Sequence, residues 1–362
     1  MMYGPFRCAE WVEIILRQQG GRGTLEICPR LTMEFGSSPA LARVSIAGGA
    51  PFIALIHGGR LQALADWSAR RGGVVWGCAS MQQMLEHWPC NAQAIAHAVL
   101  DDGQASDAAL FRFHAPVQPS SVYCTIGNYR AQLLQAALDN DEASGETAHS
   151  EQSRRERHLA AIEARRLGEP YVVAKPVSSL CGPDDQLELE AGQDTLDWEV
   201  EIGVVIGKRA RYVSAPEALQ YVAGYCTVND ITLRQRLFRL EPKGMGTDFL
   251  QAKGGPGWLP IGPLLVPASA VADPQAMELR LSLNGQVMQE GHSSDMLFCI
   301  AEQIAYLSRH VQLEPGDLIC TGSPAGFGSH YRRFLREGDV IEAEVRGVGA
   351  QRTTVRSRLR KA

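Results

Sequence analysis

The sequence predicts an α+β protein in which strands dominate, with a small α+β unit before a larger main domain. The length of 362 residues exceeds one typical domain, which favours one large domain plus a smaller one. Short apolar runs bounded by Gly, Pro, Asn and Ser recur along the chain, which is the pattern of strands and turns. Helical spacing of apolar residues is limited to a few segments.

Composition and charge argue against several classes of protein. The balance of 45% hydrophobic and 21% charged residues is that of an ordinary globular chain, and a net charge of −5 gives no reason to expect a nucleic-acid partner or an anionic membrane. The nine cysteines are scattered and odd in number without a C-x-x-C pair, which favours free thiols in a reducing compartment. Glu10 and Glu13 interrupt the apolar N-terminal run, which argues against a signal peptide. We therefore expect a cytoplasmic protein with no membrane partner.

The first part of the chain predicts an extension followed by a small domain. Residues 1–40 form the extension, in which Glu10–Gln18 has the spacing of a short amphipathic helix. Residues 41–119 form a small α+β domain. Its predicted strands and helices are, in order, Arg43–Ile46, Pro51–His57, Leu61–Leu64, Ser80–His87 and Ala92–Leu100.

Residues 120–358 form the predicted main domain, which carries an insertion at about residues 130–169. The domain begins with the apolar segment Val122–Tyr129. The insertion is rich in Ala, Glu, Arg and Gln and predicts two helices, about Ala131–Leu138 and Glu151–Leu167, joined by a polar loop. Charges of this kind usually belong to a solvated helix face. A long insertion beside a binding site also suits a lid.

Two acidic residues share one face of a predicted strand that begins near Asp197. Glu199 and Glu201 are two residues apart, and the apolar residues between and after them alternate onto the opposite face. A second strand, about Val222–Val228, leads to Asp230. The common interpretation of two acids on one strand face is a solvated surface. The alternative is a cation site, because three carboxylates suit a hard ion such as Mg²⁺ or Mn²⁺. Spacing alone leaves both interpretations open.

The remaining segments of the main domain alternate between strands and shaped loops. The strand Pro170–Pro176 contains Lys175, and an interior lysine is costly unless it is paired. Residues 251–263, around Lys253, hold too many Gly and Pro for a helix or strand. Asn284-Gly285 predicts a type I′ hairpin. Further predictions are a helix at Asp295–Arg309, a strand at Asp317–Thr321 before the glycine-rich residues 322–328, and closing strands at Gly338–Val345 and Thr353–Arg356.

Four motifs occur in one order along the main domain. They are DWEVEIGVVIGK, YVAGYCTVNDIT, QAKGGPGWLPIGP and LICTGSPAGFG. Together they resemble the fumarylacetoacetate hydrolase family, whose members cleave, hydrate, isomerise or decarboxylate 2-oxo acids at a divalent metal. The resemblance runs from about Val122 to about Val355. It implies a catalytic domain with the mixed β-roll or sandwich fold of that family, and assembly as a homodimer.

The resemblance also implies roles for individual residues. The metal, Mg²⁺ or Mn²⁺ with Ca²⁺ as a conceivable substitute, would be held by Glu199, Glu201 and Asp230. Lys175 and Lys253 would face the metal cleft and add positive charge around an enolate. A small carboxylic acid would be the substrate. Its expected binding residues are Tyr129, Arg234, Lys253, Thr321 and Gly322.

The expected reaction is hydrolysis of a carbon–carbon bond in a 2-oxo or β-dicarbonyl acid, as in acylpyruvases. Alternatives are decarboxylation, hydration or isomerisation in aromatic catabolism, or metal and acid binding without catalysis. The family pattern has a histidine and a glutamate where this chain has Gln132 and Gln135, and an amide cannot act as a base near neutral pH. Candidate substitutes are His149 and His158 in the insertion, with Glu151, Glu156 and His330 as further possibilities.

Overall fold

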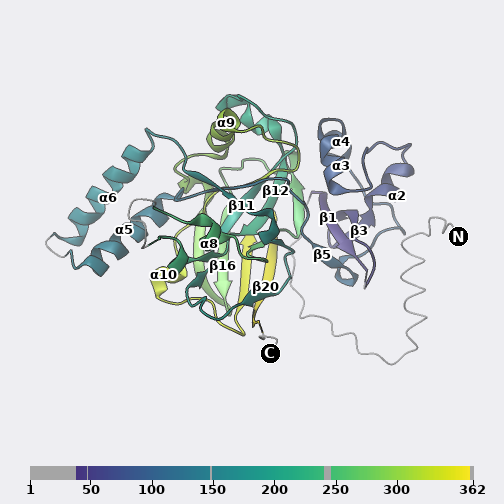
Figure 1. Cartoon of the computed structure of the whole chain (residues 1–362). Helices are drawn as coiled ribbons and strands as arrows, with labels where there is room; N and C mark the ends of the chain where they lie inside the picture. Colours follow the sequence, from purple (N-terminus) through teal and green to yellow (C-terminus); the bar gives the residue numbers. More distant parts are fainter. Residues whose placement is uncertain (1–37, 47, 147–148, 240–245, 359–362) are drawn as a thin grey trace.

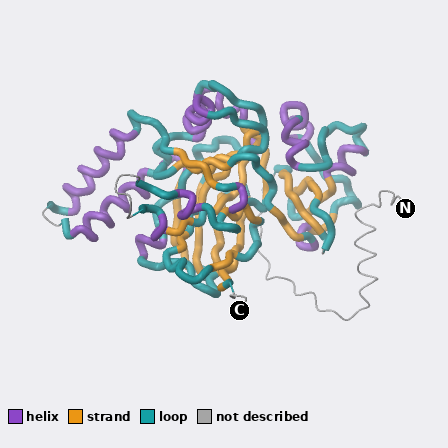
Figure 2. The backbone as a smooth tube through the Cα atoms, viewed as in Figure 1, coloured by secondary structure: helices purple, strands orange, loops and turns teal. Residues whose placement is uncertain are grey.

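The computed structural model describes residues 38–358 except 47, 147–148 and 240–245 (Figure 1). The helix predicted at Glu10–Gln18 lies outside the described residues. The described chain is a strand-rich α+β fold, as predicted, with strands grouped in the centre and helices around them (Figure 2). None of its described helices combines the length and apolar character needed to cross a bilayer.

One large sheet joins the N-terminal strands to the main domain, because β1 pairs with β15. Antiparallel pairing dominates, and β6 is parallel to β18. β5 (Arg112–His114) also pairs with β1 but is not part of the strand order given next. The order along the sheet is β4 (Ser106–Asp107), β3 (Arg60–Ala63), β2 (Phe52–His57), β1 (Ala40–Ser45), β15 (Leu264–Pro267), β12 (Val222–Asn229), β11 (Val200–Ile206), β18 (Leu318–Cys320), β6 (Val122–Thr125) and β7 (Val172–Lys175).

A second sheet packs against the centre of the first. Its order is β17 (Gln286–His292), β16 (Glu278–Leu283), β19 (Val340–Val345), β20 (Gly349–Ser357) and β9 (Leu187–Leu189). Asn284 and Gly285 both have positive φ, 53° and 80°, which confirms the predicted two-residue hairpin between β16 and β17. Val200, Ile202 and Val204 of β11 belong to the same buried cluster as Leu281 of β16. The predicted alternation of β11 is therefore correct.

The helices lie around these sheets. In the N-terminal part, α3 (Met81–Glu86) matches a predicted helix, and α4 (Trp88–Ala96) begins and ends four residues before its predicted bounds. The helix α2 (Leu64–Ala69) was not predicted because it follows β3 without a turn signal. In the main domain, α9 (Ile300–His310) begins five residues later than predicted. Residues Ser293–Asp295 instead form a 3-10 turn, and Cys299 with Glu302 forms a capping box at the helix start.

Short elements complete the main domain and border the site. The helices are α7 (Ala215–Ala218), α8 (Phe249–Lys253) and α10 (Gly328–Tyr331). The paired short strands are β8 (Leu180–Cys181) with β14 (Leu259–Pro260), and β10 (Leu196–Asp197) with β13 (Thr232–Leu233).

The insertion forms a helical hairpin made of α5 (Arg130–Ser144) and α6 (Glu151–Arg165). It projects from one side of the molecule, with α2, α3 and α4 on the other side (Figure 1). The first helix is longer than predicted and ends at Gly145, whose φ of 73° provides the left-handed cap. The hairpin is attached to the body through a small apolar cluster made of Leu134, Ile162, Leu297 and Phe298.

Candidate functional site

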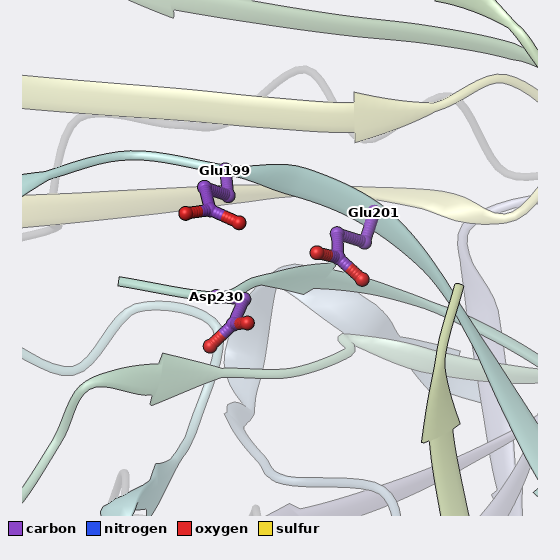
Figure 3. Close-up of side chains that lie close together, drawn as sticks. All are labelled: Glu199, Glu201 and Asp230. Carbon is purple, nitrogen blue, oxygen red and sulfur yellow. The ribbon is translucent and has the colours of Figure 1, made fainter. Parts of the chain in front are cut away.

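Glu199, Glu201 and Asp230 meet at one end of the β11–β12 pair. Glu201 lies opposite Val228 in the antiparallel register, so that Asp230, two residues later, falls beside Glu199. The Asp230 N–H donates to the Glu199 carbonyl at 2.8 Å, and this hydrogen bond holds the two residues side by side. One carboxylate oxygen from each residue lies within 4.8 Å of the others. Figure 3 shows the three side chains close together.

The acidic cluster, defined as these three residues, is buried. The exposed fraction is 6% for Glu199, 1% for Glu201 and 0% for Asp230. The solvated-face interpretation is therefore wrong for this strand. The covering elements are remote in sequence: the Gly322 N–H donates to Glu201 Oε2 at 2.8 Å, and α8 brings Lys253. Burial, followed by the charges of Asp230 and Glu199, raises the pKa of Glu201 well above its usual range.

Two buried lysines face Asp230. Lys175 Nζ lies 2.7 Å from Asp230 Oδ1, and Lys253 Nζ lies 2.5 Å from Oδ2. Lys253 also contacts Thr232 Oγ1 at 2.7 Å and Glu199 Oε2 at 3.4 Å. Burial disfavours ionisation of Asp230, but the charges and hydrogen bonds of both lysines outweigh it and hold its pKa far below the usual range. Likewise, burial would lower the pKa of Lys253, and the charges of Asp230 and Glu199 raise it instead.

Lys253 lies on a helix and not on the predicted loop. Asp248 caps α8 by accepting from the Gln251 N–H at 3.1 Å, and Lys253 is the last helical residue before Gly254. The predicted loop is wrong at Lys253, because the glycines that follow this residue end the helix and do not prevent it. Leu259 and Pro260 then pair with β8.

Arg234 links the acidic cluster to a residue that sequence reasoning missed. Its guanidinium lies 2.8 Å from Glu199 Oε1 and 2.8 Å from Asp197 Oδ2, and it stacks on the Phe327 ring at 4.4 Å. Asp197 also accepts the N–H groups of Gly328 and Ser329 at 2.7 and 3.2 Å. Asp197 thereby ties the glycine-rich segment to the site. Its place at the start of the first motif was the available signal.

Three buried donors on or beside the residues of the site have no hydrogen-bond partner within the described part of the chain. They are the Tyr129 hydroxyl, Nη2 of Arg234 and Nδ2 of Asn229, the residue before Asp230. Burial, then the charges of Glu201 and Asp295, raises the pKa of Tyr129 well above its usual range, so the hydroxyl keeps its proton and can donate. Buried polar groups are normally paired, so unpaired donors beside the acidic cluster indicate a ligand position.

Thr321 and Gly322 face the cluster in different ways. Thr321 is fully buried and its hydroxyl donates to the Ile202 carbonyl at 3.1 Å, so it supports β11 in this structure. Gly322 has a φ of 93°, and a side chain there would collide with Asn128. A glycine is therefore required for its N–H to reach Glu201.

The histidines predicted from the insertion lie away from the acidic cluster. His158 is hydrogen-bonded at 2.8 Å to Asp141, which is about 16 Å along α5 from its first residue. His149 is exposed just before the start of α6. By contrast, Gln135 Oε1 accepts the Gly326 N–H at 2.8 Å, so the face of α5 that carries the glutamines contacts the glycine-rich segment.

A cavity of about 360 Å³ opens in front of the acidic cluster. Its lining includes Gly127, Gln132, Arg165, Glu199, Lys253 and Phe327. The rings of Tyr171 and Phe249, 6.1 Å apart, form an apolar part of its wall. The cavity therefore combines a cationic and acidic floor with apolar walls, which suits a small organic acid.

The donor set fits a hard divalent cation. All three ligand candidates are carboxylates, which Mg²⁺ and Mn²⁺ accept readily, and no cysteine or histidine belongs to this group among the residues described. Three buried carboxylates repel one another, and burial followed by this repulsion raises the pKa of Glu201. A cation among them relieves that repulsion.

Comparison with known proteins agrees with this geometry. Residues 121–356 match the family model described as fumarylacetoacetate (FAA) hydrolase C-terminal, which covers more than half of the chain. The chain belongs to the fumarylacetoacetate hydrolase family. The matched region contains the acidic cluster and both lysines.

The individual relatives described next are less than half identical to this chain. The chain is 42% identical over 190 residues to the 2,4-didehydro-3-deoxy-L-rhamnonate hydrolase of Sphingomonas sp. (strain SKA58), an alignment that covers 52% of this chain and 65% of that protein. The fumarylacetoacetate hydrolase of Exiguobacterium antarcticum has a similar structure, with a TM-score of 0.66, 25% identity, and coverage of 89% of this chain and all of the other. A maleylpyruvate hydrolase of Sphingobium sp. SYK-6, solved with manganese(II) and pyruvate, shares the fold at 23% identity, a TM-score of 0.65, and coverage of 88% and 100%.

Proposed function

We propose that this chain is a divalent-metal-dependent hydrolase that cleaves a carbon–carbon bond in a 2-oxo acid with a second carbonyl two carbons further on. The observation that carries the proposal is the buried cluster of Glu199, Glu201 and Asp230, with Lys253 contacting two of its members. Membership of a family whose relatives include hydrolases and isomerases supports a hydrolase-type activity.

The three carboxylates would hold Mg²⁺ or Mn²⁺. When bound, the ion supplies Lewis-acid polarisation of the 2-oxo carbonyl. The maleylpyruvate hydrolase of the same fold was solved with manganese(II) and pyruvate, which makes Mn²⁺ and a 2-oxo acid the first choices to test.

The chain's own residues would orient the acid and stabilise negative charge. The unpaired Nη2 of Arg234 and the unpaired hydroxyl of Tyr129 can donate to the oxygens of a 2-oxo carboxylate. Lys253 keeps its proton in its buried position and places a positive charge beside the electrons released when the carbon–carbon bond breaks. The products would be a carboxylic acid and a shorter 2-oxo acid, with the elements of one water added across the bond.

A panel of acylpyruvates with added Mn²⁺ or Mg²⁺ tests the proposal. We expect loss of the β-dicarbonyl absorbance with equimolar release of a carboxylic acid and pyruvate. Glu201→Gln should abolish most of this turnover, and Glu278→Gln serves as a matched control, because Glu278 forms an exposed ion pair with Arg346. Metal binding without turnover on any substrate would favour a protein that only binds a small acid.

Decarboxylation is the second candidate, and Gln132 and Gln135 favour it. Neither amide can take a proton from water, whereas loss of CO₂ from a 3-carboxylated 2-oxo acid requires no activated water. Oxaloacetate in the same panel separates the two reactions. Release of CO₂ with no acylpyruvate cleavage would replace hydrolysis by decarboxylation.

A further inference from the structure

His330 and Asp139 form a pair beside Gln132 and Gln135, which stand where the family pattern has a histidine and a glutamate. His330 Nδ1 lies 3.0 Å from each carboxylate oxygen of Asp139. Gln132, Gln135 and Asp139 follow one another at intervals of three and four residues, so they share one face of α5. Asp139 therefore holds His330 against the helix face where the family pattern places its base and this chain has glutamines.

This helix face lines a second cavity next to the one that Glu199 of the acidic cluster lines. The second cavity has a volume of about 290 Å³ and is lined by Gln132, Gln135, Asp139, Phe327 and His330, among others. Gln132 and Phe327 also line the cavity of the acidic cluster. The two cavities thus share a wall made of these two side chains.

The position of His330 is tied to the acidic cluster by hydrogen bonds. The N–H groups of Gly328 and Ser329, two residues and one residue before it, donate to Asp197. Asp197 pairs with Arg234, and Arg234 pairs with Glu199. On the other side, Gln135 holds Gly326. The start of α10 is therefore fixed relative to the metal-binding candidates.

Other charged groups around His330 are few in the described structure. Asp139 and Glu142 come from α5, and Arg332 follows α10, all lining the same cavity. The Tyr331 ring contacts the imidazole edge at 4.9 Å between centroids. Asp139 contacts Nδ1, which leaves Nε2 to accept a proton, as in other Asp–His pairs.

We propose that His330 is the general base of the hydrolysis and that Asp139 is its positioning residue. The inference rests on the proposed function. Nε2 of His330 takes one proton from water, and the oxygen attacks the carbonyl carbon remote from the 2-oxo acid. The carbon–carbon bond breaks with its electron pair moving to the 2-oxo fragment as an enolate. The proton held by His330 then neutralises that fragment at carbon, so the imidazole returns to its neutral form.

A second His–Asp pair on the hairpin provides the contrast. His158 contacts Asp141 at 2.8 Å, and Asp141 also faces Arg157 at 3.3 Å and Arg154 at 3.9 Å, a charge network within the hairpin. His158 lines neither of the two cavities. The His330–Asp139 pair, with side chains 36% and 38% exposed, contributes little to stability, so its removal should leave the fold intact.

The test compares His330→Gln and Asp139→Asn with His310→Gln, an exposed histidine on α9 that packs on Tyr306. For acylpyruvate hydrolysis with Mn²⁺, His330→Gln should lower kcat by about 10²–10⁴-fold with KM nearly unchanged. In this variant, the fall in rate on the acidic side of the pH–rate profile (the acidic limb) should disappear. Asp139→Asn should shift that limb and, in metal-free protein, change the NMR titration of the His330 imidazole. His310→Gln should match the parent.

The outcomes are distinguishable. Parent-like kcat and an intact acidic limb in His330→Gln would overturn the assignment while leaving the proposed hydrolase activity in place. A loss confined to His158→Gln would also overturn it and move the base to the outer hairpin. Absence of hydrolysis by the unsubstituted enzyme would overturn the proposed function and this inference with it. Unchanged Mn²⁺ affinity by calorimetry in His330→Gln is expected, because His330 is no ligand candidate.

Discussion

Lys175 and Asp230 form an ion pair in which neither side chain is exposed, with Nζ 2.7 Å from Oδ1. The same Nζ donates to the Ile231 carbonyl at 3.1 Å. Lys175 ends β7, at the edge of the large sheet, while Asp230 follows β12 near its centre. The pair therefore joins separate parts of the sheet and supplies positive charge to the acidic cluster.

Removing Lys175 should destabilise the protein. Lys175→Met leaves Oδ1 of Asp230 without its partner, and a buried pair broken on one side typically costs about 3–5 kcal/mol. We expect urea unfolding of the metal-free protein to show a loss of that size. Lys208→Met is the control, because Lys208 stacks on the Tyr221 ring at 4.9 Å and forms no ion pair among the described residues. A loss below about 1 kcal/mol would mean that the pair is compensated by its surroundings.

Replacing Glu201 should separate metal binding from folding. Glu201→Gln removes one ligand candidate and also removes repulsion among buried carboxylates. We expect the Kd for Mn²⁺ to rise at least about tenfold, equivalent to about 1.4 kcal/mol, while the metal-free variant is at least as stable as the parent. Calorimetry and thermal unfolding with and without Mn²⁺ measure both. Full metal occupancy together with an unchanged Kd would remove Glu201 from the ligand set.

The extent of sequence-based prediction differs between the parts of this site. Alternation along β11 placed Glu199 and Glu201 on one face, because that relation is local. Whether the face is covered depends on Gly322 and Lys253, which are distant in sequence and arrive by tertiary packing. The His330–Asp139 contact spans 191 residues and carries no local pattern. For the acidic cluster, the four motifs and the family resemblance that they carry identified all three residues, although these residues come from different strands.

Asp339 predicts a pH dependence of stability. Its carboxylate accepts from Arg333, from the Asn284 side chain and from the Arg336 N–H, at distances between 2.6 and 2.9 Å. Burial would raise the pKa of Asp339, but these hydrogen bonds outweigh burial and lower it. A lowered pKa means that the stabilisation is present above the unfolded value of about 3.9 and is lost as pH falls through the folded value.

Asp339→Asn should therefore lose stability at neutral pH and much less in acid. We expect a cost of about 2 kcal/mol near pH 7, because hydrogen bonds to charged groups contribute about 1.5–3 kcal/mol. The difference from the parent protein should shrink below pH 4. Urea unfolding at pH 7 and pH 3.5 measures it, and an equal loss at both values would contradict the assignment of the effect to the ionised carboxylate.

Assembly as a homodimer is a further prediction, which stems from the family. Light scattering coupled to gel filtration should give twice the chain mass of 39.4 kDa. The measurement should be repeated at low protein concentration, because association follows mass action. A single species at the monomer mass over the whole range would contradict the prediction.

The helical hairpin should close over the acidic cluster when a substrate analogue binds. α5 begins directly after Tyr129, and Arg165 at the end of α6 lines the cavity, so both ends of the hairpin border the site. Between these ends, the hairpin contacts the body through Leu134 and Ile162 in a small apolar cluster, and α5 also makes the Gln135–Gly326 hydrogen bond and the partly exposed Asp139–His330 pair. Contacts of this limited number and exposure allow movement at a modest cost. Closure would exclude water from the developing charge, which strengthens its interaction with Arg234 and Lys253.

Hydrogen exchange measures the closure directly. With Mn²⁺ and oxalate bound, we expect exchange in residues 130–138 and 159–165 to slow by at least about tenfold, which corresponds to about 1.4 kcal/mol of added protection. Exchange in α9 outside its contact with the hairpin should stay the same and serves as an internal control. Leu134→Ala loosens the attachment and should raise KM more than it changes Mn²⁺ affinity, because Leu134 packs in the apolar cluster and is not one of the ligand candidates. Unchanged exchange on adding oxalate, in a protein that binds it, would show that the hairpin is fixed and that water reaches the site during turnover.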